Sequence, residues 1–254
     1  MAAPAVELTA IVLGHVDYGE ADRIVRLISA ERGLVSVLAR GVRSSKKRFG
    51  GGLEFGNRVA ALVRRGRGEL DVLDSAELLD GRPHLRADLD RIALAAYLCE
   101  LVASMARPDH AEPRLYGLLD VGLVVLDAIT EAPTPLFRLA FEAKALTFAG
   151  YAPRLDACAV CGEPFADEPL VYAPGAGGAL HRRCGGGHSI TAVAAAALDS
   201  ARRTPLADLV DTAPPDCEPW LLYEHLLWQI GRPLRSKSLL ASLEIGARPS
   251  PRSG

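Results

Sequence analysis

The sequence contains no apolar run of the roughly eighteen residues that a membrane-spanning helix needs. Its two most apolar stretches, 92–106 and 118–129, are both interrupted by acidic residues. The opening Met-Ala-Ala-Pro-Ala-Val-Glu has neither the basic region nor the apolar core of a secretory signal. We therefore expect a cytoplasmic protein with no membrane partner, in which cysteines serve metal or redox chemistry rather than disulfides.

An overall excess of positive charge is also missing. The 29 Lys and Arg residues face 31 Asp and Glu residues, and the net charge is −2. This balance excludes a uniformly basic nucleic-acid-binding surface but allows a local basic patch. The chain has no Walker A sequence, no GxGxxG that opens a helix and no GxSxG. Judged by these motifs, the sequence gives no indication of an enzyme.

The first eighty residues have the pattern of β-structure. Five short segments, mostly apolar or mixing apolar and charged positions, are separated by turn residues, at 8–16, 23–28, 34–39, 58–63 and 69–73. Their regular spacing predicts a small barrel. A five-stranded oligonucleotide-binding (OB) barrel is one candidate and an SH3-like barrel is the main rival, and the pattern alone leaves both open.

After Pro83 the apolar residues recur at helical spacing. Helices are predicted at 85–106, 114–129, 134–148, 191–202, 218–230 and 237–243, around a loop-rich segment at 151–187. The predicted fold class is therefore α+β, with a barrel followed by an α-helical domain. We expect domains at 1–80 and 81–245, a metal motif at 151–187 and a disordered tail at 246–254.

Three of the five cysteines are clustered in the loop-rich segment. Cys158-Ala-Val-Cys161 is followed, after nineteen residues, by His181-Arg-Arg-Cys184. Two pairs with two intervening residues each are typical of the two knuckles of a zinc ribbon, and a closed Cys3His set is typical of structural zinc. The sequence therefore predicts one structural Zn²⁺ per chain. His188 is an alternative nitrogen ligand, although the symmetry of the pairs favours His181.

Two other interpretations of this cluster fit the sequence less well. Cys158 and Cys161 could be ordinary buried thiols, but the double spacing disfavours this in a cytosolic chain with five cysteines. His110-Ala-Glu112 followed by the first knuckle is similar to the signature of zinc nucleobase deaminases. Against this, Ala157 replaces the proline of the signature and the second knuckle would have no role. Cys99 and Cys217 fit best as small core residues.

Basic residues are concentrated between positions 40 and 67. Nine of them face a single acid, Glu54, in that interval. A basic face on a barrel would neutralise phosphates without reading bases. Because aromatic residues are scarce in this region, stacking would add little, and binding should be sensitive to salt. The residues predicted to contact DNA are Arg40, Arg43, Lys46, Lys47, Arg48, Arg64, Arg65 and Arg67. A solvated basic loop is the simpler alternative.

A weaker basic cluster lies near the C-terminus, after an amphipathic segment. An apolar groove bordered by arginines could hold an acidic peptide with a hydrophobic end. The ordinary cationic end of a helix explains the same pattern. The candidate partner-binding residues are Arg232, Arg235 and Lys237.

Several segments resemble one known family in the right order along the chain. The N-terminal ones are Thr9-Ala-Ile-Val-Leu, Tyr18-Gly-Glu-Ala-Asp22-Arg-Ile-Val, Gly33 and Ala39-Arg-Gly-Val-Arg43. Further along are Pro153-Arg-Leu-Asp-Ala-Cys158-Ala-Val-Cys161-Gly, Gly177-Gly-Ala-Leu-His181-Arg-Arg-Cys184 and Leu226-Leu-Trp-Gln-Ile-Gly-Arg-Pro-Leu-Arg-Ser236. From about residue 8 to 243, the chain is similar to the RecO family of bacterial recombination mediators.

The resemblance implies an N-terminal OB domain and a helical domain that carries a zinc motif. Members of the family bind single- and double-stranded DNA and anneal complementary strands. They interact with RecR and with the C-terminal tail of single-stranded DNA-binding protein (SSB), and so help to load RecA onto coated strands. Their zinc set is typically four cysteines, whereas His181 occupies the third position here. Since some members lack the metal, the resemblance implies that the metal site is structural. It also implies a cytoplasmic protein that acts at the nucleoid. The rival from another class is a zinc-ribbon interaction module in transcription or translation.

Overall fold

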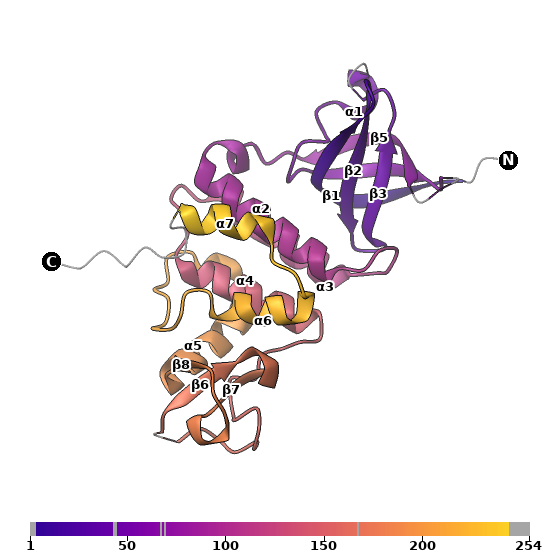
Figure 1. Cartoon of the computed structure of the whole chain (residues 1–254). Helices are drawn as coiled ribbons and strands as arrows, with labels where there is room; N and C mark the ends of the chain where they lie inside the picture. The colour runs from indigo at the N-terminus through magenta and orange to yellow at the C-terminus, as the bar shows by residue number, and fades with distance from the viewer. Residues whose placement is uncertain (1–3, 43–44, 67, 69, 167, 244–254) are drawn as a thin grey trace. The chain divides into compact units, whose positions relative to one another are not determined.

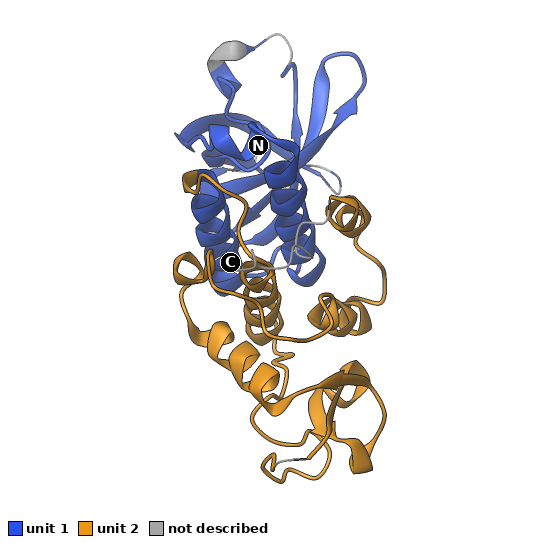
Figure 2. Cartoon of the chain, turned by 90° about the vertical axis from the view of Figure 1, so that its left-hand side faces the viewer, with its two compact units in different colours: residues 1–127 blue, residues 128–254 orange. Residues whose placement is uncertain are grey.

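A computed structural model describes residues 4–42, 45–66, 68, 70–166 and 168–243 of the chain; the side chains of residues 46 and 47 are outside this description. The chain divides into two units, residues 1–127 and 128–254, which Figure 2 colours separately. The predicted tail at 246–254 lies outside the described residues.

The first unit begins with five strands that close into a barrel (Figure 1). The strands are β1 (Ala5–Tyr18), β2 (Asp22–Ser29), β3 (Gly33–Ala39), β4 (Arg58–Arg64) and β5 (Asp71–Asp80), with a short helix α1 (Lys46–Phe49) between β3 and β4. Around the barrel their order is β1-β2-β3-β5-β4, and β4 pairs with β1 to close it. This order, with β3 parallel to β5, is that of an OB barrel and decides against the SH3-like alternative.

Strand β1 closes the barrel because it is long and bent. Its first half pairs with β4 from Ala5 to Ile11, and its second half pairs with β2 from Ala10 to Tyr18. The register shifts between Val12 and Gly14, where Gly14 has a φ of 140°. A bulge of this kind increases the local twist, which lets one strand serve two neighbours.

The barrel is filled by the alternating inward side chains of all five strands. Val12, Val25, Leu27, Val37 and Val59, for example, are completely buried in one core cluster. Phe49 of α1 and Leu53 belong to the same cluster, so the β3–β4 connection covers one end of the barrel. The apolar residues of the predicted strands thus form the core, on the inward face of each strand.

The fifth strand is longer than the sequence predicted. Residues 69–73 were expected, but β5 extends to Asp80 because it pairs with β4 from Arg58↔Asp80 to Arg64↔Val72. Asp74, Ser75 and Glu77 interrupt the apolar run, and cross-strand pairing supplies the stabilisation that the run itself lacks.

Two helices complete the first unit. The single helix predicted at 85–106 is divided into a 3-10 turn, η1 (Pro83–Arg86), and α2 (Leu89–Met105). The division occurs because Asp88 caps α2, with its carboxylate accepting a hydrogen bond of 2.8 Å from the Arg91 amide. Helix α3 (Pro113–Ala128) follows close to its predicted position.

The second unit is mainly helical. It contains α4 (Pro135–Phe148), α5 (Ala192–Arg203), the 3-10 turn η4 (Leu206–Leu209), α6 (Leu221–Ile230) and α7 (Arg235–Ser242). Between α4 and α5 the chain forms a small antiparallel sheet in the order β7-β6-β8. Its elements are β6 (Leu170–Ala173), the 3-10 turn η2 (Pro174–Ala176), β7 (Gly178–His181), the 3-10 turn η3 (Arg182–Cys184) and β8 (His188–Ile190). The α+β fold class predicted from the sequence is confirmed.

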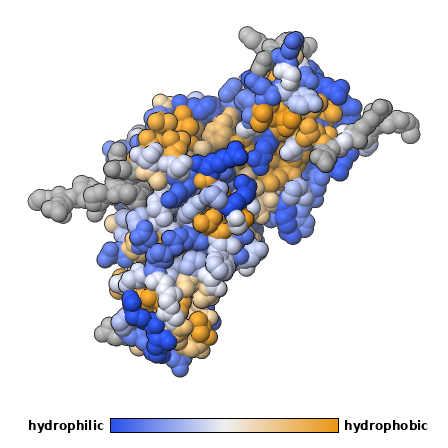
Figure 3. All heavy atoms as spheres, in the orientation of Figure 1, coloured by the Kyte–Doolittle hydropathy of each residue, from blue (hydrophilic) through white to orange (hydrophobic). Residues whose placement is uncertain are grey.

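On the face seen in Figure 3, hydrophilic and hydrophobic residues are interspersed in small groups. Among the described residues, no helix is both long enough and apolar enough to span a bilayer.

Candidate metal centre and nucleic-acid interface

The structure brings together the four residues of the predicted metal set. The thiol sulfurs of Cys158, Cys161 and Cys184 and a ring nitrogen of His181 all lie within 4.8 Å of one another. Cys158 and Cys161 are in the turn before β6, whereas His181 ends β7 and Cys184 ends η3. The group could therefore hold a metal ion.

Hydrogen bonds from backbone amides shape the Cys158–Cys161 side of this site. The Cys161 amide lies 3.5 Å from the Cys158 sulfur, and the Gly162 amide donates to the Cys158 carbonyl at 2.9 Å, which forms a tight turn. The Ala159 amide donates to the Ala179 carbonyl at 2.9 Å and fastens this turn to β7. Spacing that looked like a knuckle in the sequence is thus a knuckle in the fold.

His181 is completely buried and has a defined orientation. Its Nδ1 lies 3.4 Å from the Cys161 sulfur and 3.9 Å from the Cys184 sulfur. Its Nε2 points the other way and lies 3.4 Å from Oε1 of Glu168, in a geometry that does not make a hydrogen bond. The ring therefore offers Nδ1 to the cysteines. His188 does not belong to the group, and its Nε2 lies 2.6 Å from Glu224.

The thiols of the group differ in acidity. Burial opposes ionisation of Cys158, but backbone hydrogen bonds from Cys161, His181 and Val160 outweigh it and lower its pKa to about 6. Burial, with the neighbouring thiols, raises the pKa of Cys184 to about 11. Three sulfurs and one imidazole nitrogen at these separations fit the tetrahedral donor set of structural zinc, with no position left for water.

The basic segment predicted from the sequence is only partly free to meet a ligand. Arg40 and Arg48 are exposed, but Arg48 donates to the Arg40 carbonyl at 2.6 Å and to the Ser45 hydroxyl at 3.1 Å. Its guanidinium also lies over the Phe49 ring, 4.9 Å from the centroid. Arg48 therefore packs against its own loop. Of the other residues in this loop, Arg43 lies outside the described residues, as do the side chains of Lys46 and Lys47.

Acidic residues from outside the segment pair with three of its arginines, and the first pair joins Arg58 to Asp120 at 3.5 Å. Arg64 makes two hydrogen bonds to Asp74 on β5, of 2.8 and 3.1 Å, and the Arg64 guanidinium holds the pKa of Asp74 below its usual value. Arg65 lies 3.2 Å from Asp109 and 3.8 Å from Asp71. The sequence interval contains nine basic residues and one acidic residue, but the surface around it carries a smaller net positive charge than this count suggests. Arg67 lies outside the described residues.

A groove of about 270 Å³ lies beside β3 and brings two further arginines to the barrel surface. Arg26 comes from β2 and Arg32 from the β2–β3 turn, and the groove also contains Arg65. We call it the Arg32 groove; its other lining residues include Leu34, Ser36, Asp71, Pro108 and Asp109. In OB barrels the β2–β3 face and the β4–β5 loop are the usual surface for oligonucleotides. Sequence analysis missed Arg26 and Arg32, because each stands outside the basic run.

Comparison with known proteins supports the same architecture. The family model described as "Recombination protein O N terminal" matches residues 1–82, and the one described as "Recombination protein O C terminal" matches residues 86–238. The chain belongs to the RecO family.

Curated RecO proteins resemble the chain over most of its length. "DNA repair protein RecO" of Anaeromyxobacter dehalogenans (strain 2CP-C) is 48% identical over 182 residues, which cover 71% of this chain and 70% of the relative. The protein of the same name from Syntrophotalea carbinolica is 36% identical over 248 residues, or 94% of this chain and 95% of the relative. The one from Myxococcus xanthus is 36% identical over 246 residues, with coverages of 93% and 97%. The resemblance noted in the sequence is therefore confirmed.

The C-terminal basic residues of this RecO-family chain lie in and just before α7. Arg232 is exposed in the α6–α7 turn, and Arg235 is exposed at the start of α7. The Lys237 ammonium lies over the rings of Trp220 and Tyr223, at 4.8 and 5.4 Å from their centroids. Their assignment to partner binding stays a prediction.

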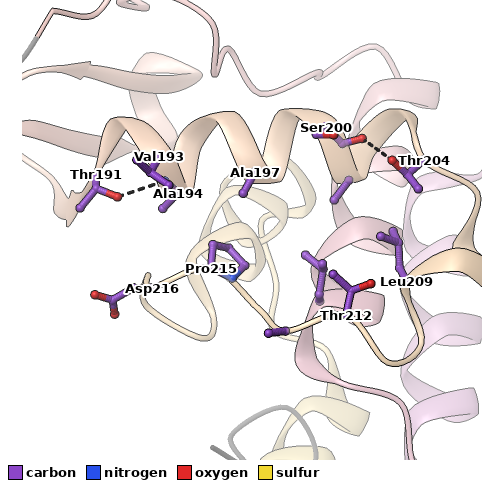
Figure 4. Close-up of a pocket in the computed structure, with 13 residues that line it drawn as sticks. Thr191, Val193, Ala194, Ala197, Ser200, Thr204, Leu209, Thr212, Pro215 and Asp216 are labelled. Atoms are coloured by element: carbon purple, nitrogen blue, oxygen red, sulfur yellow. Dashed lines mark hydrogen bonds between the residues drawn. The ribbon is translucent and has the colours of Figure 1, made fainter. Parts of the chain in front are cut away.

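A second cavity, of about 320 Å³, lies along α5 in the RecO C-terminal region. In Figure 4, Ala194 and Ala197 of α5 lie on one side of this cavity, and Thr212 and Pro215 lie on the other. Asp216 is the one charged residue in its lining. The cavity is thus apolar and contains no base, so its chemistry does not suit a phosphate.

Proposed function

We propose that this RecO-family protein binds single- and double-stranded DNA and anneals complementary strands without catalysis. Together with RecR, it would help to load RecA onto single strands coated with SSB. The observation that carries the proposal is the closed OB-type barrel, whose β3–β4 connection and β4–β5 turn bear the basic segment. Membership of the RecO family supports it.

The proposed annealing relies on electrostatic screening. Basic side chains on the barrel reduce the repulsion between two phosphate backbones, and base pairing then supplies the free energy, so no nucleotide hydrolysis is needed. Stacking contributes little, because Phe49 is buried in the barrel core and Tyr18 is the exposed aromatic residue of the barrel strands. Binding should therefore depend strongly on salt and weakly on sequence.

For the metal centre we propose a structural Zn²⁺ held by Cys158, Cys161, His181 and Cys184. A closed set of four protein ligands stabilises the fold and leaves no open position for chemistry. His181 would bind through Nδ1, and its Nε2–H would face the Glu168 carboxylate. Ligand histidines commonly have such a partner, which fixes the tautomer and the ring orientation.

The two proposed domains follow one another along the chain and have different roles. We propose that residues 1–80 form the DNA-binding OB domain and that residues 81–245 form the helical domain, with the zinc motif at 151–187. The break between the two matched family models, at residues 82 and 86, supports this boundary. Arg232, Arg235 and Lys237 remain candidates for binding an acidic partner such as the SSB tail, in the cytoplasm at the nucleoid.

The test is the salt dependence of binding to single-stranded DNA. A triple variant, Arg43→Ala, Lys46→Ala and Lys47→Ala, removes predicted phosphate contacts and leaves the packed Arg48 in place. For single strands the slope of log K against log salt changes by about 0.7 per contact, so the slope should flatten by up to about 2.

The matched control removes three exposed arginines elsewhere in the chain, Arg114→Ala, Arg154→Ala and Arg203→Ala. It has the same net charge as the triple variant and should keep the slope of the parent protein. Equal slopes for both variants would show that the basic segment is not the DNA site.

A further inference from the structure

Two arginines in the Arg32 groove share two carboxylates. The Arg32 guanidinium lies 2.9 Å from Asp71 and also hydrogen-bonds to Oδ1 of Asp109. Arg65 lies 3.2 Å from Oδ2 of the same Asp109. Asp109 therefore bridges both guanidinium groups with its two oxygens, as the oxygens of a phosphate would. Arg26, in the same groove, has no ion pair within the described part of the chain.

The two carboxylates have different surroundings. The side chain of Asp71 is 7% exposed, and it also accepts a hydrogen bond of 3.2 Å from the Gly66 amide. It is part of the barrel wall. The side chain of Asp109 is 49% exposed and lies at the surface of the groove. A ligand that approaches from solvent could displace Asp109 from the two arginines, whereas Asp71 would stay.

The backbone fixes Asp109 in this position. The Asp109 amide donates to the Leu34 carbonyl at 3.3 Å, and the Leu34 amide donates to the Arg107 carbonyl at 3.2 Å. A Cβ atom at Gly33 would lie 2.4 Å from the carbonyl oxygens of both Arg107 and His110, so the α2–α3 connection packs directly on the β2–β3 turn. This approach requires glycine.

Asp109 itself has a φ of 52°, and it is the one residue other than glycine with positive φ in the described chain. Left-handed backbone is uncommon outside glycine, although Asp and Asn tolerate it. Strain of this kind is kept where the surrounding structure enforces it, often at functional sites. The carboxylate is thus held against Arg32 and Arg65 at a backbone cost.

We propose that the Arg32 groove is a subsite for a phosphate of the nucleic-acid backbone, and that Asp109 sets its affinity by competing with that phosphate for Arg32 and Arg65. The inference rests on the proposed DNA binding. Asp109 weakens the contact, because a phosphate has to replace its carboxylate on both arginines. Removing its charge should therefore tighten binding, which is opposite to the usual effect of a substitution at a binding site.

The experiment measures binding of a fluorescein-labelled oligo(dT) to the full-length protein over a range of salt concentrations. Asp109→Asn keeps the side-chain size and tolerates the left-handed backbone. We expect roughly twofold to tenfold tighter binding at low salt, since two exposed ion pairs no longer compete. The slope of log K against log salt should steepen by up to about 1.4, for two additional contacts.

Asp17→Asn is the matched control, because Asp17 is similarly exposed and pairs with Arg23 on the same barrel, and neither of these residues lines the groove. It changes the net charge equally. Asp109→Gly is a second variant, which removes the charge and relieves the backbone. Adding Arg32→Gln and Arg65→Gln to Asp109→Asn should abolish the gain.

The outcomes separate the two proposals. If the parent binds oligo(dT) but Asp109→Asn and Asp109→Gly bind no more tightly than Asp17→Asn, the groove is not a phosphate subsite, whereas the proposed DNA binding stands. If neither the parent nor the Asp109 variants bind at low salt, both proposals are wrong.

Discussion

His225 should make the second unit less stable as the pH falls. Its ring, on α6, is 1% exposed, and its Nδ1 lies 2.6 Å from the hydroxyl of Tyr172 on β6. A neutral imidazole accepts a hydrogen bond from that hydroxyl at Nδ1, whereas a protonated one carries hydrogen on both ring nitrogens and can only donate to the hydroxyl oxygen. Burial lowers the pKa of His225 to about 4 from its ordinary 6.5.

The size of the effect follows from proton linkage. The unfolded chain binds a proton at His225 below about pH 6.5, whereas the folded chain does so only near pH 4, so folding loses stability across this interval. With these two values, the free energy of unfolding should fall by about 2 kcal/mol between pH 7 and pH 5. The full stability from His225 is present above pH 6.5.

Urea unfolding of the zinc-loaded protein at pH 7, 6 and 5 provides the assay. The control is the double variant Tyr172→Phe/His225→Leu, which replaces both partners with apolar groups and so leaves no buried polar atom unpaired. The double variant should be about as stable as the parent at pH 7 and should lose about 2 kcal/mol less at pH 5. Both proteins keep the metal site, so any acid-induced loss of metal should lower their free energies of unfolding equally and cancel in the comparison. Equal losses in both would refute the assignment to His225.

Two further substitutions test other contacts. Glu168→Ala should weaken zinc binding by about 10- to 100-fold, measured by competition with a chromophoric chelator, because His181 would lose the carboxylate that we propose orients its ring in the zinc-loaded protein. Glu168→Gln should retain most of the affinity. Equal affinity for both variants and the parent would remove Glu168 from the site. Arg138→Met should lower the free energy of unfolding by about 3 kcal/mol, because it takes the guanidinium away from the buried Glu142 carboxylate, 2.5 Å distant. Replacing both residues, as Arg138→Met/Glu142→Leu, should recover most of the loss, and a double variant no more stable than the single one would contradict this account of the pair.

The sequence predicted the elements better than their connections. Short apolar runs between turn residues located four of the five strands closely, because each strand buries one face in the barrel. The choice between OB and SH3-like barrels depended on which strands pair across the chain. That information lies in the closure of β1 on β4 and in the parallel pairing of β3 with β5. The division of the first predicted helix depended on a single cap, at Asp88.

The candidate sites show the same distinction. The four metal-ligand candidates were found from local spacing, since each knuckle is a short turn. The net positive charge of the proposed DNA-binding face is lower than the basic segment predicts, because the acids that pair with it are remote in the sequence: Asp74 lies 10 residues from Arg64 and Asp109 lies 44 residues from Arg65. Arg32 and Asp109 are 77 residues apart, so a local stretch of sequence does not show that they meet in the Arg32 groove.

The central claim is that the protein anneals DNA through a basic barrel and without chemistry. It is tested most directly by mixing two complementary oligonucleotides with the purified protein in the absence of nucleotide, at low and moderate salt, before and after zinc removal. The account predicts annealing that is faster than the protein-free rate, weakens as salt rises and survives removal of the metal if the fold is retained. No acceleration by folded, zinc-loaded protein at low salt would contradict it.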